Sequence, residues 1–71
     1  MKINEETTLA KAEINNVTIT LTCSNESYYT VEERTHSCIL DEATLAHYAD
    51  AVDYFRGCVN TWIAIELEQA Q

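Results

Sequence analysis

The chain has 71 residues, with 12 Asp or Glu against 4 Lys or Arg, so its formal net charge at pH 7 is −8. This length predicts one domain over residues 1–71 and argues against a large multi-site enzyme. The excess of acid disfavours direct binding to nucleic acid and to anionic membranes, because both interactions depend on Lys and Arg.

Residues 9–23 are the first predicted element, a β-hairpin that turns at Asn15 and Asn16. Asn tolerates the positive φ that a two-residue hairpin turn requires. If Ile14 pairs with Val17, apolar side chains gather on one face and polar ones on the other, as in a half-buried sheet. The same register opposes Ala12 with Ile19, Ala10 with Leu21, Glu13 with Thr18, Lys11 with Thr20 and Leu9 with Thr22.

A third strand is predicted in the segment SYYTVEERTH, after a turn at residues 24–26. A three-residue loop opposes Leu21 with Tyr29 and Ile19 with Val31, which keeps the apolar residues on one face. The sequence therefore predicts a three-stranded antiparallel meander with residues 17–23 in the centre. Charged side chains on both edge strands discourage pairing with other sheets.

The C-terminal part predicts a long helix from about residue 42 to residue 69, capped by Asp41 and spanning about 42 Å. Glu42 is favourably placed in the first turn of that helix. Gly57 offers an alternative, in which the helix breaks and a strand follows, but the continuous helical phase favours the helix. The positions that share this phase are Leu45, Tyr48, Ala49, Val52, Phe55, Val59, Trp62 and Ile63. The predicted fold class is α+β, with three strands followed by one helix that overhangs its sheet.

A second apolar stripe runs along the same predicted helix. Either the helix is kinked and its two halves bury different faces, or the stripe forms a homodimer interface. We expect the homodimer, which would also cover the overhanging end. The stripe consists of Ala51, Tyr54, Cys58, Trp62 and Ile65.

The cysteines are Cys23, Cys38 and Cys58, an odd number without a close pair. A small secreted scaffold needs an even disulfide framework. The segment MKINEETT has no apolar core typical of a secretory signal, and no apolar run approaches the roughly 18 residues of a membrane span. We therefore expect reduced thiols and a cytoplasmic location.

Candidate metal and catalytic residues are sparse. His47, Asp50 and Asp53 share one face of the predicted helix, an arrangement that is usually a solvated surface. His36, Cys38 and Cys23 lack the paired spacing of a zinc site. The neighbours His36, Ser37 and Cys38 do not define a nucleophile with its base, and the single glycine excludes a phosphate-binding loop. We expect no enzymatic activity, no metal and no cofactor.

Binding is the remaining class of function. The polar face of the predicted sheet carries Thr18, Thr20, Thr22, Tyr28, Thr30 and Glu32. Tyr28 and Glu32 could anchor a partner on this face. Carboxylates attract basic surfaces, and the predicted partner-binding residues are Glu32, Glu33, Asp50, Asp53 and Tyr28.

In its small size, its acidity and its lack of a catalytic motif, the chain resembles the acidic inhibitors that bacteriophages deploy against host defence, of the anti-CRISPR and anti-restriction type. The resemblance implies a nucleic-acid mimic in the host cytoplasm that occupies a basic channel of a nucleic-acid-handling protein. An alternative is a homodimeric structural or adaptor protein that recognises partners through the apolar helix stripe.

Overall fold

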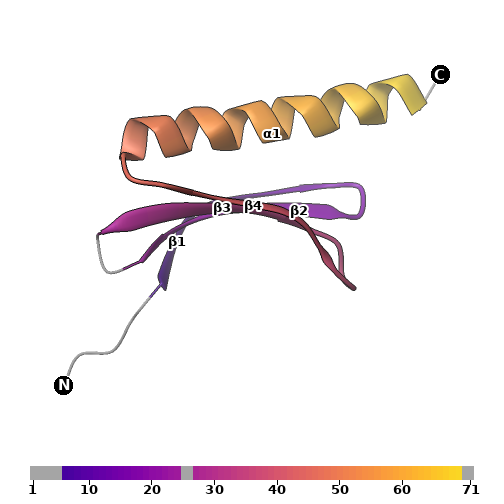
Figure 1. The fold of residues 1–71 in the computed structure, drawn as a ribbon. Coiled ribbons are helices and arrows are strands. Elements are labelled where there is room, and N and C mark those ends of the chain that lie inside the picture. Colours follow the sequence, from indigo (N-terminus) through magenta and orange to yellow (C-terminus); the bar gives the residue numbers. More distant parts are fainter. Residues whose placement is uncertain (1–5, 25–26, 70–71) are drawn as a thin grey trace.

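The computed structural model describes residues 6–24 and 27–69. Four antiparallel strands form one sheet in the order β1-β2-β3-β4, and a single helix lies across one face of it (Figure 1). The predicted α+β class and the C-terminal helix are confirmed, but the sheet has four strands rather than three. The elements are β1 (Glu6–Ile14), β2 (Val17–Ser24), β3 (Tyr28–Arg34), β4 (Ile39–Leu45) and α1 (Tyr48–Gln69).

The β1–β2 hairpin turns where the sequence predicts. Asn15 has a φ of 59°, the left-handed conformation that Asn tolerates better than most residues. The predicted pairs from Ile14–Val17 to Ala10–Leu21 are all present. The predicted pairing of Leu9 with Thr22 is wrong, because the register shifts between Thr8 and Ala10 and Thr8 opposes Thr22 instead.

The register between β2 and β3 differs from the prediction by two residues. Leu21 opposes Val31 rather than Tyr29, and Ile19 opposes Glu33 rather than Val31. Side chains alternate with a period of two, so this even shift leaves each residue on its predicted face. Residues 25 and 26 of the predicted turn lie outside the described residues. The consequence is that Glu33 lies beside Ile19 on the side of the sheet that faces the helix.

The strand β4 replaces the predicted start of the helix. Asp41 and Glu42 were expected as the helix cap and first turn, and both predictions are wrong, because the residues lie in mid-strand and α1 begins at Tyr48. Pairing with β3 gives this segment backbone partners, and such tertiary pairing overrides local helix propensity. The helix has 22 residues and spans about 33 Å, shorter than predicted.

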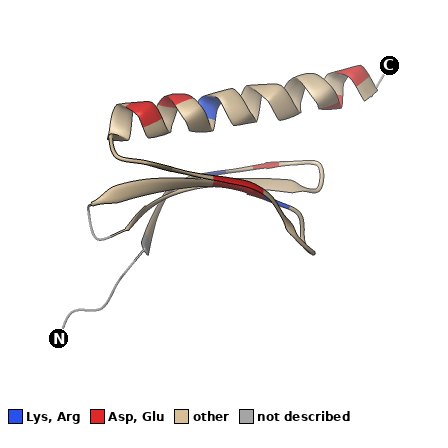
Figure 2. Ribbon diagram, in the orientation of Figure 1, with Lys and Arg blue, Asp and Glu red and all other residues tan. Residues whose placement is uncertain are grey.

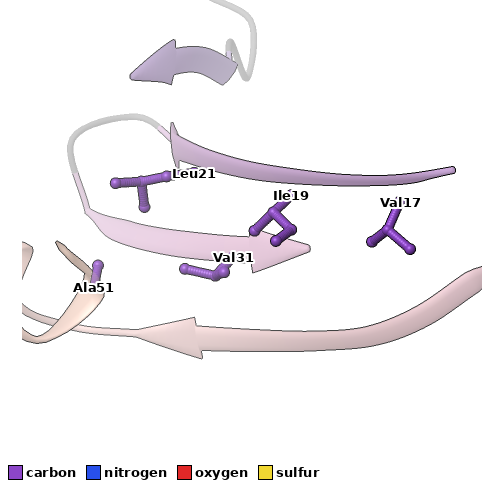
Figure 3. Close-up of a cluster of buried hydrophobic side chains, with 5 residues drawn as sticks. All are labelled: Val17, Ile19, Leu21, Val31 and Ala51. Carbon is purple, nitrogen blue, oxygen red and sulfur yellow. The ribbon is translucent and has the colours of Figure 1, made fainter. Parts of the chain in front are cut away.

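The helix α1 continues through Gly57, as the sequence favours, and the alternative of a C-terminal strand is excluded. Ala51 is fully buried among the core side chains Val17, Ile19, Leu21 and Val31 (Figure 3). Both predicted stripes contribute to the side of α1 that faces the sheet, which consists of Ala51, Val52, Phe55, Cys58, Val59 and Trp62.

Four residues of the first predicted stripe are not part of that buried side, since Leu45 lies in β4 and Tyr48, Ala49 and Ile63 are exposed. Tyr48 is 56% exposed and Ile63 is 42% exposed. The C-terminal end of α1 extends past the end of the sheet (Figure 1), so the predicted overhang is present.

No helix in the described part of the chain is both long and apolar enough to cross a membrane.

Candidate partner-binding surfaces

The carboxylates of β3 and β4 form two cross-strand pairs. Glu32 opposes Glu42, and Glu33 opposes Asp41. Successive residues of a strand point to opposite faces of the sheet. The Glu32–Glu42 pair therefore lies on the face away from α1, and the Glu33–Asp41 pair lies on the face beneath it.

The face away from α1, which we call the open face, is rich in threonine. One row of residues across the four strands consists of Thr8, Thr22, Thr30 and Thr44, each opposite the next. The neighbouring row carries Thr20 beside the Glu32–Glu42 pair. Parts of these two rows enclose a cavity of about 190 Å³, lined by Thr20, Thr22, Thr30, Glu32 and Glu42.

The two carboxylates of this cavity are unequally compensated. The Glu32 carboxylate lies 3.5 Å from a guanidinium nitrogen of Arg34. Glu42 is exposed and forms no ion pair with any residue that the structure describes. A cation that enters the cavity would therefore meet one free carboxylate and several hydroxyl groups. The sequence predicted this face through Tyr28 and Glu32 but missed Glu42, which it had placed in the helix.

The other predicted partner-binding residues lie elsewhere. Asp50 and Asp53 are exposed, on the side of α1 that helical geometry turns away from the sheet. Figure 2 shows acidic positions in the N-terminal half of the helix. Glu33 points toward the helix, so it cannot act with Glu32 on one flat surface. The five predicted residues are thus divided among three surfaces, and only Tyr28 and Glu32 share the open face.

A second concave surface, the α1–β3 groove, lies along the helix with a volume of about 400 Å³. Its polar residues join the helix to the sheet. The Tyr54 hydroxyl donates a hydrogen bond of 3.4 Å to Asp41 Oδ2, and the Cys58 thiol lies near enough to the Glu33 carboxylate for that carboxylate to raise the pKa of the thiol. The groove is lined by Glu33, Tyr54, Gly57, Cys58, Thr61, Trp62 and Ile65.

The acidic side chains raise the pKa values of both donors, Tyr54 and Cys58. Burial, followed by the hydrogen bond and the negative charge of Glu33, raises the pKa of the Cys58 thiol to about 12. The charge of Asp41 is the largest cause that raises the pKa of Tyr54 above 10.0. Both groups therefore keep their protons at neutral pH and act as hydrogen-bond donors to the carboxylates.

The structure corrects the basis of the expected dimer interface. Ala51 is fully buried in the core, and Cys58 and Trp62 are half-buried where they pack against that core and line the α1–β3 groove. Tyr54 and Ile65 line the α1–β3 groove. The stripe does not form a second exposed face of the helix, because α1 uses most of it to contact the sheet. The homodimer itself stays a prediction.

The remaining candidates give no site. Cys23, Cys38 and Cys58 are free thiols. Within residues 6–24 and 27–69, no three His, Cys, Asp or Glu side chains form a group that could hold a metal ion. Comparisons with protein-family models, curated proteins and solved structures found no match to the chain.

Proposed function

We propose that this protein is a small acidic inhibitor that binds the basic surface of a nucleic-acid-handling protein through the open face of its sheet. The observation that carries this proposal is the Glu32–Glu42 pair, placed in a threonine-lined cavity on the uncovered face. Lys or Arg of the partner would enter the cavity and contact these carboxylates. The proposal assigns the protein to binding proteins rather than to enzymes.

Electrostatic repulsion within the pair supports this assignment. Residues directly opposite on neighbouring antiparallel strands have Cβ atoms about 5 Å apart, and like charges at that distance destabilise a sheet. A bound Lys or Arg offsets the repulsion between Glu32 and Glu42. The surrounding threonine hydroxyls supply acceptors for the remaining N–H groups of the cation.

The overall charge supports the choice of a basic partner. A net charge of −8 attracts a surface that normally binds nucleic acid and accelerates its association. The chain carries fewer charges per unit length than a DNA duplex, which has one per roughly 1.7 Å. The mimicry that we propose is therefore local, at a few phosphate positions, and not that of an extended duplex.

The test uses a partner captured from a host lysate and then purified. Its affinity and association rate are measured at about 0.05 M and 0.5 M salt for the wild type and for Glu32→Lys with Glu42→Lys. The matched control is Asp50→Lys with Asp53→Lys, which changes the charge equally on the outer side of α1. We expect salt to slow association, because a Debye length of about 10 Å at 0.1 M screens long-range attraction.

We expect the Glu32/Glu42 reversal to abolish binding and the Asp50/Asp53 reversal to weaken it only slightly. If the two variants lose affinity equally, the loss depends on net charge alone, and the assignment of the binding surface to the open face is overturned. Binding that tolerates both salt and the Glu32/Glu42 reversal would contradict the proposal and favour an adaptor with an apolar interface.

A further inference from the structure

We propose that the α1–β3 groove binds an arginine side chain from a basic partner protein. This site lies on the helix-covered side of the sheet and is separate from the open face, so the inference does not depend on the proposed function. The groove combines the Glu33 carboxylate with an apolar wall, and Asp41 lies next to it through its hydrogen bond with Tyr54. Glu33 and Asp41 supply the negative charge, and Trp62 and Ile65 supply the apolar side of the groove.

Glu33 in the groove and Asp41 beside it have neutral partners. Glu33 is half-buried beside the Cys58 thiol, whose pKa it raises, and Asp41 accepts a hydrogen bond from the Tyr54 hydroxyl. Neither carboxylate forms an ion pair with a residue in the described part of the chain. The raised pKa values of both donors are consistent with a negative potential in the groove. The groove therefore attracts a cation that the chain itself does not supply.

The walls select the kind of cation. Trp62 and Ile65 give the groove an apolar side, and Tyr54 adds a second aromatic ring. Arginine is suited to such a site because its planar guanidinium stacks on aromatic rings and forms paired hydrogen bonds with a carboxylate. The volume of about 400 Å³ falls within the range of cavities that bind small ligands.

A second copy of this chain is a poor occupant. Each copy carries a net charge of −8, so two copies repel one another. Neither arginine can fill the groove of its own chain, since Arg34 pairs with Glu32 and Arg56 lies on the opposite flank of α1, beside Phe55, Val59 and Asn60. The complementary charge must come from a basic partner.

Trp62 is the only tryptophan of the chain, so its fluorescence reports on the groove. The probe is N-acetyl-arginine amide, titrated to about 0.1 M at constant ionic strength. N-acetyl-citrulline amide is the control, because it has nearly the same shape without the charge. We expect a saturable fluorescence change with the arginine probe and at least tenfold weaker binding of the citrulline probe.

Two matched pairs of variants locate the site. We expect Glu33→Gln to weaken binding of the arginine probe about tenfold or more, because a charge-assisted hydrogen bond is lost. Glu68→Gln, which removes the same charge at an exposed position, should bind like the wild type. Ile65→Ala shortens the apolar wall and should weaken binding, whereas Ile63→Ala on the other flank of the helix should not.

Three results would overturn the inference. They are equal responses to the two probes, unchanged binding in Glu33→Gln, and equal losses in both members of either pair. Circular dichroism checks that each variant is folded. If Glu33→Gln does not fold, the comparison of Ile65→Ala with Ile63→Ala still tests the site. The Glu32/Glu42 reversal should leave the fluorescence titration intact, so a failure of this inference is distinguishable from a failure of the proposed function.

Discussion

The thiol of Cys58 offers a direct test of the chemistry beneath the helix. Burial and the neighbouring Glu33 carboxylate raise its pKa to about 12 from the usual 9.0. Only the thiolate reacts with an alkylating agent, so Cys58 should react slowly. Replacing Glu33 by Gln removes the negative charge and should accelerate the reaction.

The expected magnitude follows from the two pKa values. At pH 8, a thiol of pKa 9.0 is about one tenth ionised, whereas one of pKa about 12 is ionised at roughly one part in ten thousand. The more basic thiolate is also the better nucleophile. At a Brønsted slope near 0.45 its intrinsic reactivity is about 20-fold higher, which partly offsets its smaller ionised fraction. Cys58 should therefore react about 50-fold more slowly than an ordinary thiol.

The assay is alkylation of the native protein with iodoacetamide at pH 8, followed by mass spectrometry of its peptides. Cys38 is exposed and serves as the reference thiol in the same molecule. In Glu33→Gln the Cys58 rate should rise by less than 50-fold, because burial is the largest cause of the raised pKa and persists.

Glu68→Gln is the control for the loss of a charge and should leave the Cys58 rate unchanged. If Cys58 reacts as fast as Cys38 in the wild type, or if Glu33→Gln leaves its rate unchanged, the proposed contact between the thiol and the carboxylate is refuted.

Three further predictions concern stability, each measured by urea unfolding near pH 7 unless stated otherwise. Ile19→Ala should lower the free energy of unfolding by about 2–5 kcal/mol, because Ile19 is fully buried; a smaller loss would contradict its place in the core. Gly57→Ala should raise that free energy by up to about 1 kcal/mol, because a Cβ there meets open space and alanine favours the helix; a lower value would contradict the continuous helix. Stability should also fall as the pH rises from 9.0 toward about 12, because the folded state keeps the Cys58 proton that the unfolded chain releases; this fall should be smaller in Cys58→Ala.

The sequence predicted the hairpin and the faces of three strands, because these depend on local signals. Asn15 set the β1–β2 turn, and the alternation of apolar residues in 17–23 identified the buried face. The turn after β2 has no comparable signal, and the register was displaced by two residues. That displacement left the faces unchanged but gave Glu33 a different neighbour, Ile19.

The fourth strand could not be predicted from local propensity. The segment ILDEATL contains Asp, Glu and Ala, which are uncommon in strands, and it precedes a true helix. Its strand conformation depends on pairing with β3, a contact that the sequence pattern does not reveal. Both acidic pairs of the candidate sites depend on this strand, so neither Glu42 nor Asp41 could be assigned to a site beforehand.

The antiparallel register divides two acidic doublets between the two faces of the sheet. Each doublet, Glu32-Glu33 and Asp41-Glu42, sends one carboxylate to the open face and one toward α1. On the open face Arg34 compensates Glu32, whereas beneath the helix the carboxylates have, among the described residues, the neutral partners Tyr54 and Cys58. The repulsion should therefore cost more beneath the helix than on the open face.

Neutralising each pair in turn tests this difference. In dilute buffer, Glu33→Gln with Asp41→Asn should raise the free energy of unfolding, by up to about 1 kcal/mol, because the amide oxygens still accept the same hydrogen bonds without the repulsion. Glu32→Gln with Glu42→Gln should raise it less, since this change also removes the ion pair with Arg34. If Glu32→Gln with Glu42→Gln gains more free energy of unfolding, then Glu33 and Asp41 are better compensated than their neutral partners imply. The physical basis for attracting a cation to the groove is then lost.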